Sequence, residues 1–281
     1  MPTYDTPEPI DLAINLRVGG IEVIASDRAD TVVTVRPTNP AKDHDRRGAE
    51  ATRVEFDGQR VTIVGPRPRI TVFGPNESVE IKVELPNGSR LTAENAVGGV
   101  RAIGRLGATR IKASMGAIEL DATADLSVRA SLGSVTVGRA DGAVDVTADH
   151  GQIRVGSVTG DALLKASHGS ILIEESGGNV EARLSYGDLE VGRALASVST
   201  KTSYGSIRIG EASLGSIDVE SAMGQIDIGV RNGVPAWLDL SSKSGRVRNE
   251  LDRDSAPHST EQTVAIRGRS QVGDITVHRA R

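Results

Sequence analysis

The sequence contains no cysteine, so disulfide bonds and thiolate metal sites are excluded. Aromatic residues make up only 2% of the 281 residues, whereas a globular core of this size normally uses several large rings. Long apolar runs are missing as well, and the first residues, from Met1 to Pro9, are neither basic nor apolar. We therefore expect a cytoplasmic protein without a secretion signal or a membrane-spanning segment. These features are compatible with peripheral association of the protein with a membrane.

An excess of one charge is also lacking. The 33 basic and 37 acidic residues are mixed along the chain, and the formal net charge is −4. Because no basic run stands out and aromatic residues are too few to stack bases, nucleic acid is not expected as a partner. Motifs for nucleophilic catalysis, nucleotide binding and zinc proteases are absent, so we expect no enzyme, no metal and no cofactor.

What the sequence does contain is a repeat. A glycine followed by alternating apolar residues recurs at intervals of 17, 18, 18, 18, 18 and 19 residues, at Gly116, Gly133, Gly151, Gly169, Gly187, Gly205 and Gly224. A second alternating segment lies halfway along most repeats, for example from Val144 to Ala148. A period of two residues is typical of a strand with one buried face. Each repeat therefore predicts two short strands joined by tight turns, with glycine supplying the corner.

Repeats this short cannot bury an apolar face alone, so they must stack on one another at about 4.8 Å. The sequence thus predicts an all-β fold, a single-stranded parallel β-helix (β-solenoid) with coils of about 18 residues. We expect one continuous domain with an N-terminal β region and cap (residues 1–92), regular solenoid repeats (93–230) and C-terminal coils with a cap (231–281). The polar segment 40–52 is predicted to be an exposed loop or a short helix.

The two flanks are less regular than the repeats. Before the repeats we expect strands at residues 10–16, 21–25, 31–35, 54–56, 61–64, 70–73 and 79–85, which form wider starting coils or a small β-sandwich. After them, strands at 263–266 and 273–277 follow a polar loop at 252–261. Caps are required because an open end would expose unpaired strand edges, and Trp237 is predicted to cover the last coil.

Several of these segments resemble a known family. The Gly-x-Ile-x-Val repeats, the segment Trp237-Leu-Asp-Leu with Gly245-Arg-Val-Arg-Asn, and the closing Gly273-Asp-Ile-Thr-Val are similar to the bacterial β-strand-repeat "putative adhesin" family, which is frequent in actinobacteria. The resemblance extends from Asp11 to Arg279. It implies a β-solenoid of uncharacterised role, with a link to the bacterial envelope and no established activity.

One feature departs from that family. Its members commonly carry Gly-Ser-Gly-Asp at each coil corner, whereas here the corner is mostly Ser followed by Met, His or Tyr and then Gly. Aspartate follows the corner glycine only at Asp188 and Asp274. The departure argues against any role that needs a regular line of corner aspartates.

The residues that precede the repeat glycines form the main candidate site. They are Met115, Leu132, His150, His168, Tyr186, Tyr204 and Met223, and serines precede five of them, at Ser114, Ser131, Ser167, Ser185 and Ser203. Because residues one coil apart stack directly, the four central residues from His150 to Tyr204 are predicted to form a continuous His/Tyr ladder. An exposed ladder flanked by hydroxyls suits the binding of an extended polymer, such as a glycan, or of membrane head groups. Alternatively, these large side chains pack over the glycine corners and cover backbone.

Two weaker candidates involve histidine and aspartate. Asp149 and His150 with His168 could form a metal site or an acid/base pair, but no third ligand is evident. The cluster Asp43-His44-Asp45 could chelate a cation, although charged loops of this kind are usually only solvated.

The expected function is a non-enzymatic scaffold that presents a rigid solenoid surface to a protein, a glycan or a membrane-associated partner, or that associates with itself. The alternative is a carbohydrate-active enzyme, a polysaccharide lyase or hydrolase on a parallel β-helix. Such enzymes need clustered carboxylates, or a basic residue beside bound calcium, in a groove walled by long loops. The turns between these coils are only a few residues long, which favours the scaffold.

Overall fold

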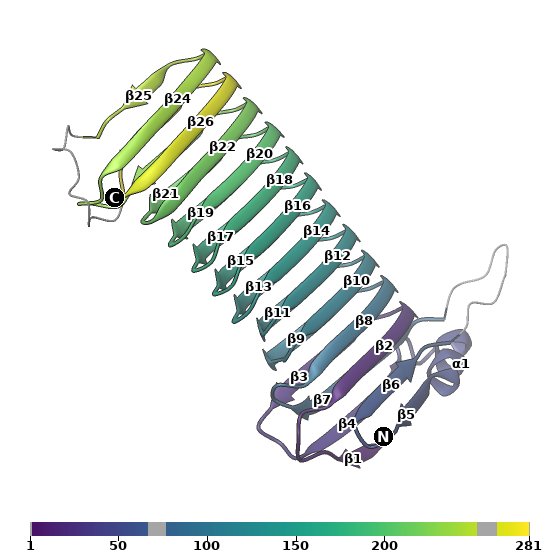
Figure 1. Ribbon diagram of the computed structural model, residues 1–281. Coiled ribbons are helices and arrows are strands. Elements are labelled where there is room, and N and C mark those ends of the chain that lie inside the picture. The colour runs from purple at the N-terminus through teal and green to yellow at the C-terminus, as the bar shows by residue number, and fades with distance from the viewer. Residues whose placement is uncertain (1, 67–76, 252–262, 281) are drawn as a thin grey trace. The chain divides into compact units, whose positions relative to one another are not determined.

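The computed structural model describes residues 2–66, 77–251 and 263–280. The chain divides into two compact units, Met1–Arg139 and Ala140–Arg281. Each unit consists of short strands in two sheets (Figure 1), which confirms the predicted all-β fold. Within the described ranges the one α-helix is α1 (Asp43–Ala51), and no helix is long and apolar enough to cross a membrane. The domain boundaries expected at residues 92 and 230 stay a prediction.

In the first unit, one sheet has the strand order β1–β4–β7–β3–β9–β11–β13, and the other has the order β12–β10–β8–β2–β6–β5. Their bounds are β1 (Thr3–Asp5), β2 (Asp11–Val18), β3 (Ile21–Ser26), β4 (Asp30–Pro37), β5 (Arg53–Phe56), β6 (Arg60–Val64), β7 (Val79–Pro86), β8 (Arg90–Val97), β9 (Val100–Arg105), β10 (Thr109–Met115), β11 (Ile118–Thr123), β12 (Leu126–Leu132) and β13 (Val135–Ala140). The strands expected in this flank are present, except that residues 70–73 lie outside the described part of the chain.

In the second unit, the two sheets have the orders β15–β17–β19–β21–β23–β27–β25 and β24–β26–β22–β20–β18–β16–β14. Their bounds are β14 (Val144–His150), β15 (Ile153–Val158), β16 (Ala162–His168), β17 (Ile171–Ser176), β18 (Val180–Tyr186), β19 (Leu189–Ala194), β20 (Val198–Tyr204), β21 (Ile207–Ala212), β22 (Gly215–Met223), β23 (Ile226–Val230), β24 (Ala236–Ser244), β25 (Val247–Asn249), β26 (Val264–Val272) and β27 (Ile275–Arg279). The polar loop expected at 252–261 lies outside the described residues.

The coils of the second unit stack in parallel and in register. Strand β16 pairs with β14 and β18, so that Leu164 lies between Val146 and Ala182. These three side chains are buried, whereas the alternate residue Leu163 points outward and is only half-buried. Period-two alternation therefore builds a thin apolar core between the two sheets, as expected for strands with one buried face.

Glycine is required at the coil corners. All seven repeat glycines have a positive φ, between 138° and 155°. A Cβ added at Gly205 would lie 2.0 Å from the carbonyl oxygen of Gly187, one coil earlier. The corner backbone is hydrogen-bonded between coils as well, since the N–H of Gly169 donates to the carbonyl oxygen of Tyr186 at 2.9 Å. Any side chain at these positions would separate adjacent coils.

At the end of the second unit, the coils do not follow the order of the sequence. The C-terminal strands β26 and β27 are inserted between β22–β23 and β24–β25, so the coil from β24 to β25 comes last. Trp237 in β24 pairs with the outward-facing Ala265 and is 63% exposed. The prediction that Trp237 covers the last coil is therefore wrong, because its position in the alternation places it on the outer face.

The first unit begins with wider and partly antiparallel pairings. Strand β4 pairs antiparallel with both β1 and β7, and β5 pairs antiparallel with β6. The coil of β2 and β3 lies between β8–β9 and β6–β7, so this end is also out of sequence order. Segment 40–52 was predicted to be an exposed loop or a short helix, and the structure has a short helix there, α1.

Candidate functional site

The His/Tyr ladder lies at the ends of strands β14, β16, β18 and β20, which are neighbours in one sheet of the second unit (Figure 1). His150 is directly opposite His168, His168 opposite Tyr186, and Tyr186 opposite Tyr204. Their ring centroids are 4.7, 5.1 and 4.9 Å apart, and the ring planes differ by 6°, 6° and 2°. The four rings therefore form one parallel stack with the spacing of the strands.

The ladder is exposed to solvent. Tyr186 and Tyr204 are 50% and 46% exposed, and both histidines are exposed as well. The corner backbone beneath is already hydrogen-bonded between coils, so the rings are not needed to shield it.

The stacking determines which atoms of the ladder are accessible. Each inner ring has a neighbouring ring on both faces, so its faces are covered and its edge is free. Within the described ranges, the imidazole nitrogens and phenol hydroxyls of the ladder have no hydrogen-bond partner. The ladder therefore presents a row of polar ring edges at a spacing of about 4.8 Å.

The same column continues with apolar side chains. Tyr204 is followed by Met223 and then by Val272, which are directly opposite one another on β22 and β26. Both are about half exposed. Single exposed apolar residues are normal on protein surfaces, so Met223 and Val272 extend the column without defining a separate site.

The serines predicted to flank the ladder lie on the same outer surface of the sheet. Ser185 and Ser203 are exposed and Ser167 is half-buried. Their hydroxyls have no hydrogen-bond partner in the described part of the chain, so they are available to a ligand.

A further column, which was not predicted from the sequence, lies beside these serines. Two residues before each serine stands a basic residue, namely Lys165, Arg183 and Lys201, and all three are exposed. They are directly opposite one another on β16, β18 and β20. The signal was present in the sequence, as Lys165-Ala-Ser-His-Gly, Arg183-Leu-Ser-Tyr-Gly and Lys201-Thr-Ser-Tyr-Gly. An alignment of the repeats two residues further back would have shown it.

Two shallow hollows lie over this column. The first has a volume of about 200 Å³ and is lined by side chains of Thr147, Lys165, Ser167, Arg183 and Ser185. The second has a volume of about 280 Å³ and is lined by Arg183 and Lys201, by Glu220 of the same column, and by Glu181 and Asp218 of the next column. Both are open to solvent, so they offer surface contacts rather than an enclosed reaction chamber.

The weaker candidates do not assemble a metal site. Asp149 and His150 are both exposed at the corner of β14, and the described residues contain no group of three metal-binding side chains. Asp45 is buried, and its two carboxylate oxygens accept hydrogen bonds from the backbone N–H groups of Asn39 and Ser78 at 3.1 and 3.0 Å. Asp43 forms an ion pair with Arg46. The cluster Asp43-His44-Asp45 therefore anchors α1 instead of presenting free ligands.

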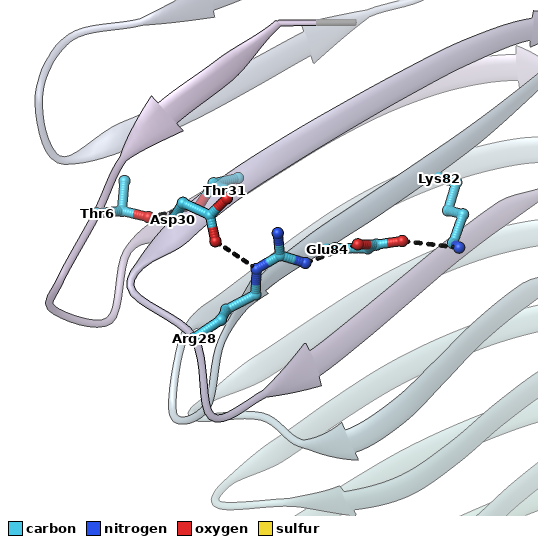
Figure 2. A network of polar contacts seen from close by, with 6 residues as sticks. All are labelled: Thr6, Arg28, Asp30, Thr31, Lys82 and Glu84. Atoms are coloured by element: carbon cyan, nitrogen blue, oxygen red, sulfur yellow. Dashed lines mark hydrogen bonds and ion pairs between the residues drawn. The ribbon is translucent and has the colours of Figure 1, made fainter.

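The first unit contains a polar network that was not predicted from the sequence (Figure 2). The Arg28 guanidinium donates to the carboxylates of Asp30 at 2.8 Å and Glu84 at 2.7 Å, and Lys82 lies 2.8 Å from Glu84. The hydrogen bond from Arg28 lowers the pKa of Asp30, while Lys82 and then Arg28 lower the pKa of Glu84. Because it connects β4 and β7, this network has a structural role.

Replacing Arg28 with glutamine is expected to reduce stability at neutral pH and to raise the pKa of Asp30 and Glu84. Both carboxyl groups have a lowered pKa in the folded state, so their stabilising contribution is present above the unfolded pKa and lost as pH falls through the folded value. In urea unfolding, the difference between wild type and Arg28→Gln should therefore be larger at about pH 7 than at about pH 3. Arg36→Gln, an exposed change on β4, is the control. A difference for Arg28→Gln that stays the same at both pH values would contradict this role.

The repeated parallel coils and the exposed stack of side chains define a β-solenoid repeat protein. A family model described as Toastrack DUF4097 matches residues 11–280, and the chain belongs to that family. This confirms the family predicted from the repeats, while the actinobacterial type stays a prediction. A search of curated proteins gives no match.

A search of the solved structures gives matches over nearly the whole chain, of which three are described. A "putative adhesin" from Bacteroides fragilis is 13% identical, with 98% of this chain and 95% of that chain covered and a TM-score of 0.43. A "putative cell adhesion protein" from Clostridium sporogenes is 10% identical, with coverages of 99% and 98% and a TM-score of 0.21. A "putative adhesin" from Parabacteroides distasonis is 12% identical, with coverages of 98% and 95% and a TM-score of 0.28. Likenesses this distant carry no functional argument.

Proposed function

We propose that this protein is a non-enzymatic binding scaffold whose His/Tyr ladder holds an extended glycan along the coil corners of the second unit. The observation that supports the proposal is the ladder itself, four exposed rings stacked in register at 4.7 to 5.1 Å. Because the rings are nearly evenly spaced, the row suits a ligand that is itself periodic. A polysaccharide carries hydroxyl groups on every residue and can meet successive ring edges with hydrogen bonds.

Because the ring edges are free and the inner ring faces are covered, the ladder favours hydrogen bonds to a sugar over stacking against one. Sugar rings and nucleobases that stack on aromatic residues need a free ring face, and the inner faces of the ladder are covered by their neighbours. The free edges of His150 and His168 offer ring nitrogens, and those of Tyr186 and Tyr204 offer hydroxyls. The neighbouring serine hydroxyls widen the same polar strip.

The enzyme alternative receives no support from a specific observation. Strand β14 passes into β15 through a corner of only two residues, Gly151 and Gln152, so no long loop walls a groove there. The hollows over β14 to β22 are shallow and open. Glycoside hydrolysis needs two carboxyl groups that hold one sugar between them. Of the three carboxylates that line the second hollow, Glu181 and Glu220 already form ion pairs with Arg183 and Lys201.

The proposal is tested by affinity electrophoresis of the folded protein through gels that contain neutral or acidic polysaccharides. We expect at least one polysaccharide to retard the wild type, and the variant His150→Ala/His168→Ala/Tyr186→Ala/Tyr204→Ala to migrate as in an empty gel. The loss follows because the variant removes every polar ring edge of the ladder while leaving the buried faces of the strands intact.

A matched control changes four outward residues on consecutive coils of the other sheet, Arg154→Ala/Leu172→Ala/Glu190→Ala/Arg208→Ala. These residues are directly opposite one another on β15, β17, β19 and β21, as the ladder residues are on their own sheet. The control should be retarded like the wild type, and circular dichroism should show that both variants keep the strand content. Equal retardation of the ladder variant and the wild type, or no retardation by any polysaccharide, would refute the proposal.

A further inference from the structure

The basic column beside the ladder is unfavourable for the sheet alone. Lys165, Arg183 and Lys201 lie directly opposite one another on three adjacent parallel strands. Like charges placed directly opposite each other across strands destabilise a sheet. Positions on the outer face accept almost any polar residue, so three consecutive cations are not needed for the fold. The fold alone therefore does not explain why cations stand at all three positions.

The protein supplies counter-charges for two of the three cations. Arg183 forms an ion pair with Glu181 of its own strand at 2.8 Å, and Lys201 forms one with Glu220 of β22 at 2.9 Å. For Lys165, no acidic partner is found in the described part of the chain. The unpaired ammonium group lines the hollow of about 200 Å³ together with the hydroxyls of Ser167 and Ser185. Ammonium, guanidinium and hydroxyl groups around one hollow can all donate hydrogen bonds to an anionic oxygen.

The basic column of Lys165, Arg183 and Lys201 is only one residue wide on each strand, which limits the shape of its ligand. On the side away from the serines it is bordered by an outward column that includes Asp145, Glu181 and Asp218. A plane of anionic lipid head groups laid on this surface would meet these carboxylates as well as the cations. A single anionic chain that runs along the serines would meet the cations on one side and the ladder on the other.

The ladder excludes a nucleic acid as the preferred anionic chain. Single-stranded nucleic acids are held by bases stacked on aromatic faces, in addition to contacts with their phosphates. Here the inner ring faces are covered, and only their polar edges are free. A chain that combines negative charge with many hydroxyl groups satisfies both the cations and the ring edges.

From these observations we infer that the strip of Lys165, Arg183, Ser167 and Ser185, together with the His/Tyr ladder, binds an acidic polysaccharide through its carboxylate groups. The inference rests on the proposed function and adds that the glycan bound there is negatively charged. Lys165 and Arg183 bind a carboxylate in the hollow, the serines donate hydrogen bonds to it, and the ladder edges contact sugar hydroxyls on the neighbouring side.

The test is calorimetric titration of the full chain with a polygalacturonate oligomer and with a neutral xylan oligomer of equal length. We expect the wild type to bind the acidic oligomer about tenfold more tightly than the neutral one, as charge-assisted hydrogen bonds imply. Lys165→Gln/Arg183→Gln should remove that preference and leave the affinity for the neutral oligomer unchanged. Added salt should weaken only the binding of the acidic oligomer.

The control variant Arg154→Gln/Arg208→Gln removes the same charge from outward positions on the other sheet. It should keep the preference, and an equal loss in both double variants would overturn the inference in favour of a general charge effect. Equal affinity of the wild type for the two oligomers would overturn the inference and leave the proposed function standing. No binding of either oligomer would overturn the inference, whereas the proposed function fails only if no polysaccharide retards the protein in the electrophoresis. Binding of single-stranded DNA or phosphatidylglycerol vesicles as tight as that of polygalacturonate would also overturn the assignment.

Discussion

Replacing Gly205 with alanine is expected to lower the free energy of unfolding by about 3 kcal/mol or more. The residue has a φ of +147°, a conformation that L side chains rarely adopt. A methyl group there would lie 2.0 Å from the carbonyl oxygen of Gly187, closer than real Cβ atoms approach a neighbouring atom. In the variant, the two coils must therefore separate at this corner. Their separation would also strain the hydrogen bond from the N–H of residue 205 to the carbonyl oxygen of Met223.

Urea unfolding followed by circular dichroism measures this loss, and Gly233→Ala is the matched control. Gly233 also has a positive φ, of 78°, but no atom lies within 4 Å of an added Cβ. Its replacement isolates the backbone strain alone, which is expected to cost about 1 kcal/mol. If Gly205→Ala were no more destabilising than Gly233→Ala, the corner would have room for a side chain and the close stacking of the coils would be incorrect.

Replacing Leu164 with alanine is expected to cost about 3 kcal/mol. Its side chain is 0% exposed and lies between Val146 and Ala182 of the adjacent coils. The core between two sheets of a solenoid is only one side chain deep on each side, so few neighbours can move to fill the space. Because each coil depends on its immediate neighbours, the cavity should weaken the stack locally.

Leu163→Ala is the control for this prediction, since it makes the same chemical change one residue earlier on the same strand. Leu163 points outward between Asp145 and Glu181, and its truncation should cost no more than about 1 kcal/mol. The two values come from urea unfolding, and hydrogen exchange should show faster opening of β14, β16 and β18 only in Leu164→Ala. Similar losses for the two variants would contradict the assignment of the inner and outer faces.

The regular coils could be predicted because one rule repeats along the chain. Alternating apolar residues and a glycine about every 18 residues leave parallel stacking as the arrangement that buries the apolar face. The same fixed length determined which residues share a column, so the order from His150 to Tyr204 was predictable. Strand β20 was harder to recognise, because Thr200 and Thr202 occupy its inward positions. Their neighbours in the stack place them inside despite their hydroxyl groups.

The irregular ends were not predictable in the same way. No local signal in Trp237 or its neighbours shows that β26 and β27 insert before the coil of β24 and β25. The prediction of Trp237 as a cover assumed that the last strands in the sequence are also the last in the stack. Pairing between segments far apart in the chain decided the order, and such pairing depends on the whole set of available edges.

The repeat length was enough to predict the class of fold, the glycine corners and the residues of each side-chain column, because it imposes the register. The tertiary structure alone decided that the ladder rings stand exposed, cover one another's faces and leave their edges free. It also decided that Lys165 has no acidic partner in the described ranges while Arg183 and Lys201 have one. These properties depend on side-chain directions and on contacts between coils, which a period in the sequence does not specify.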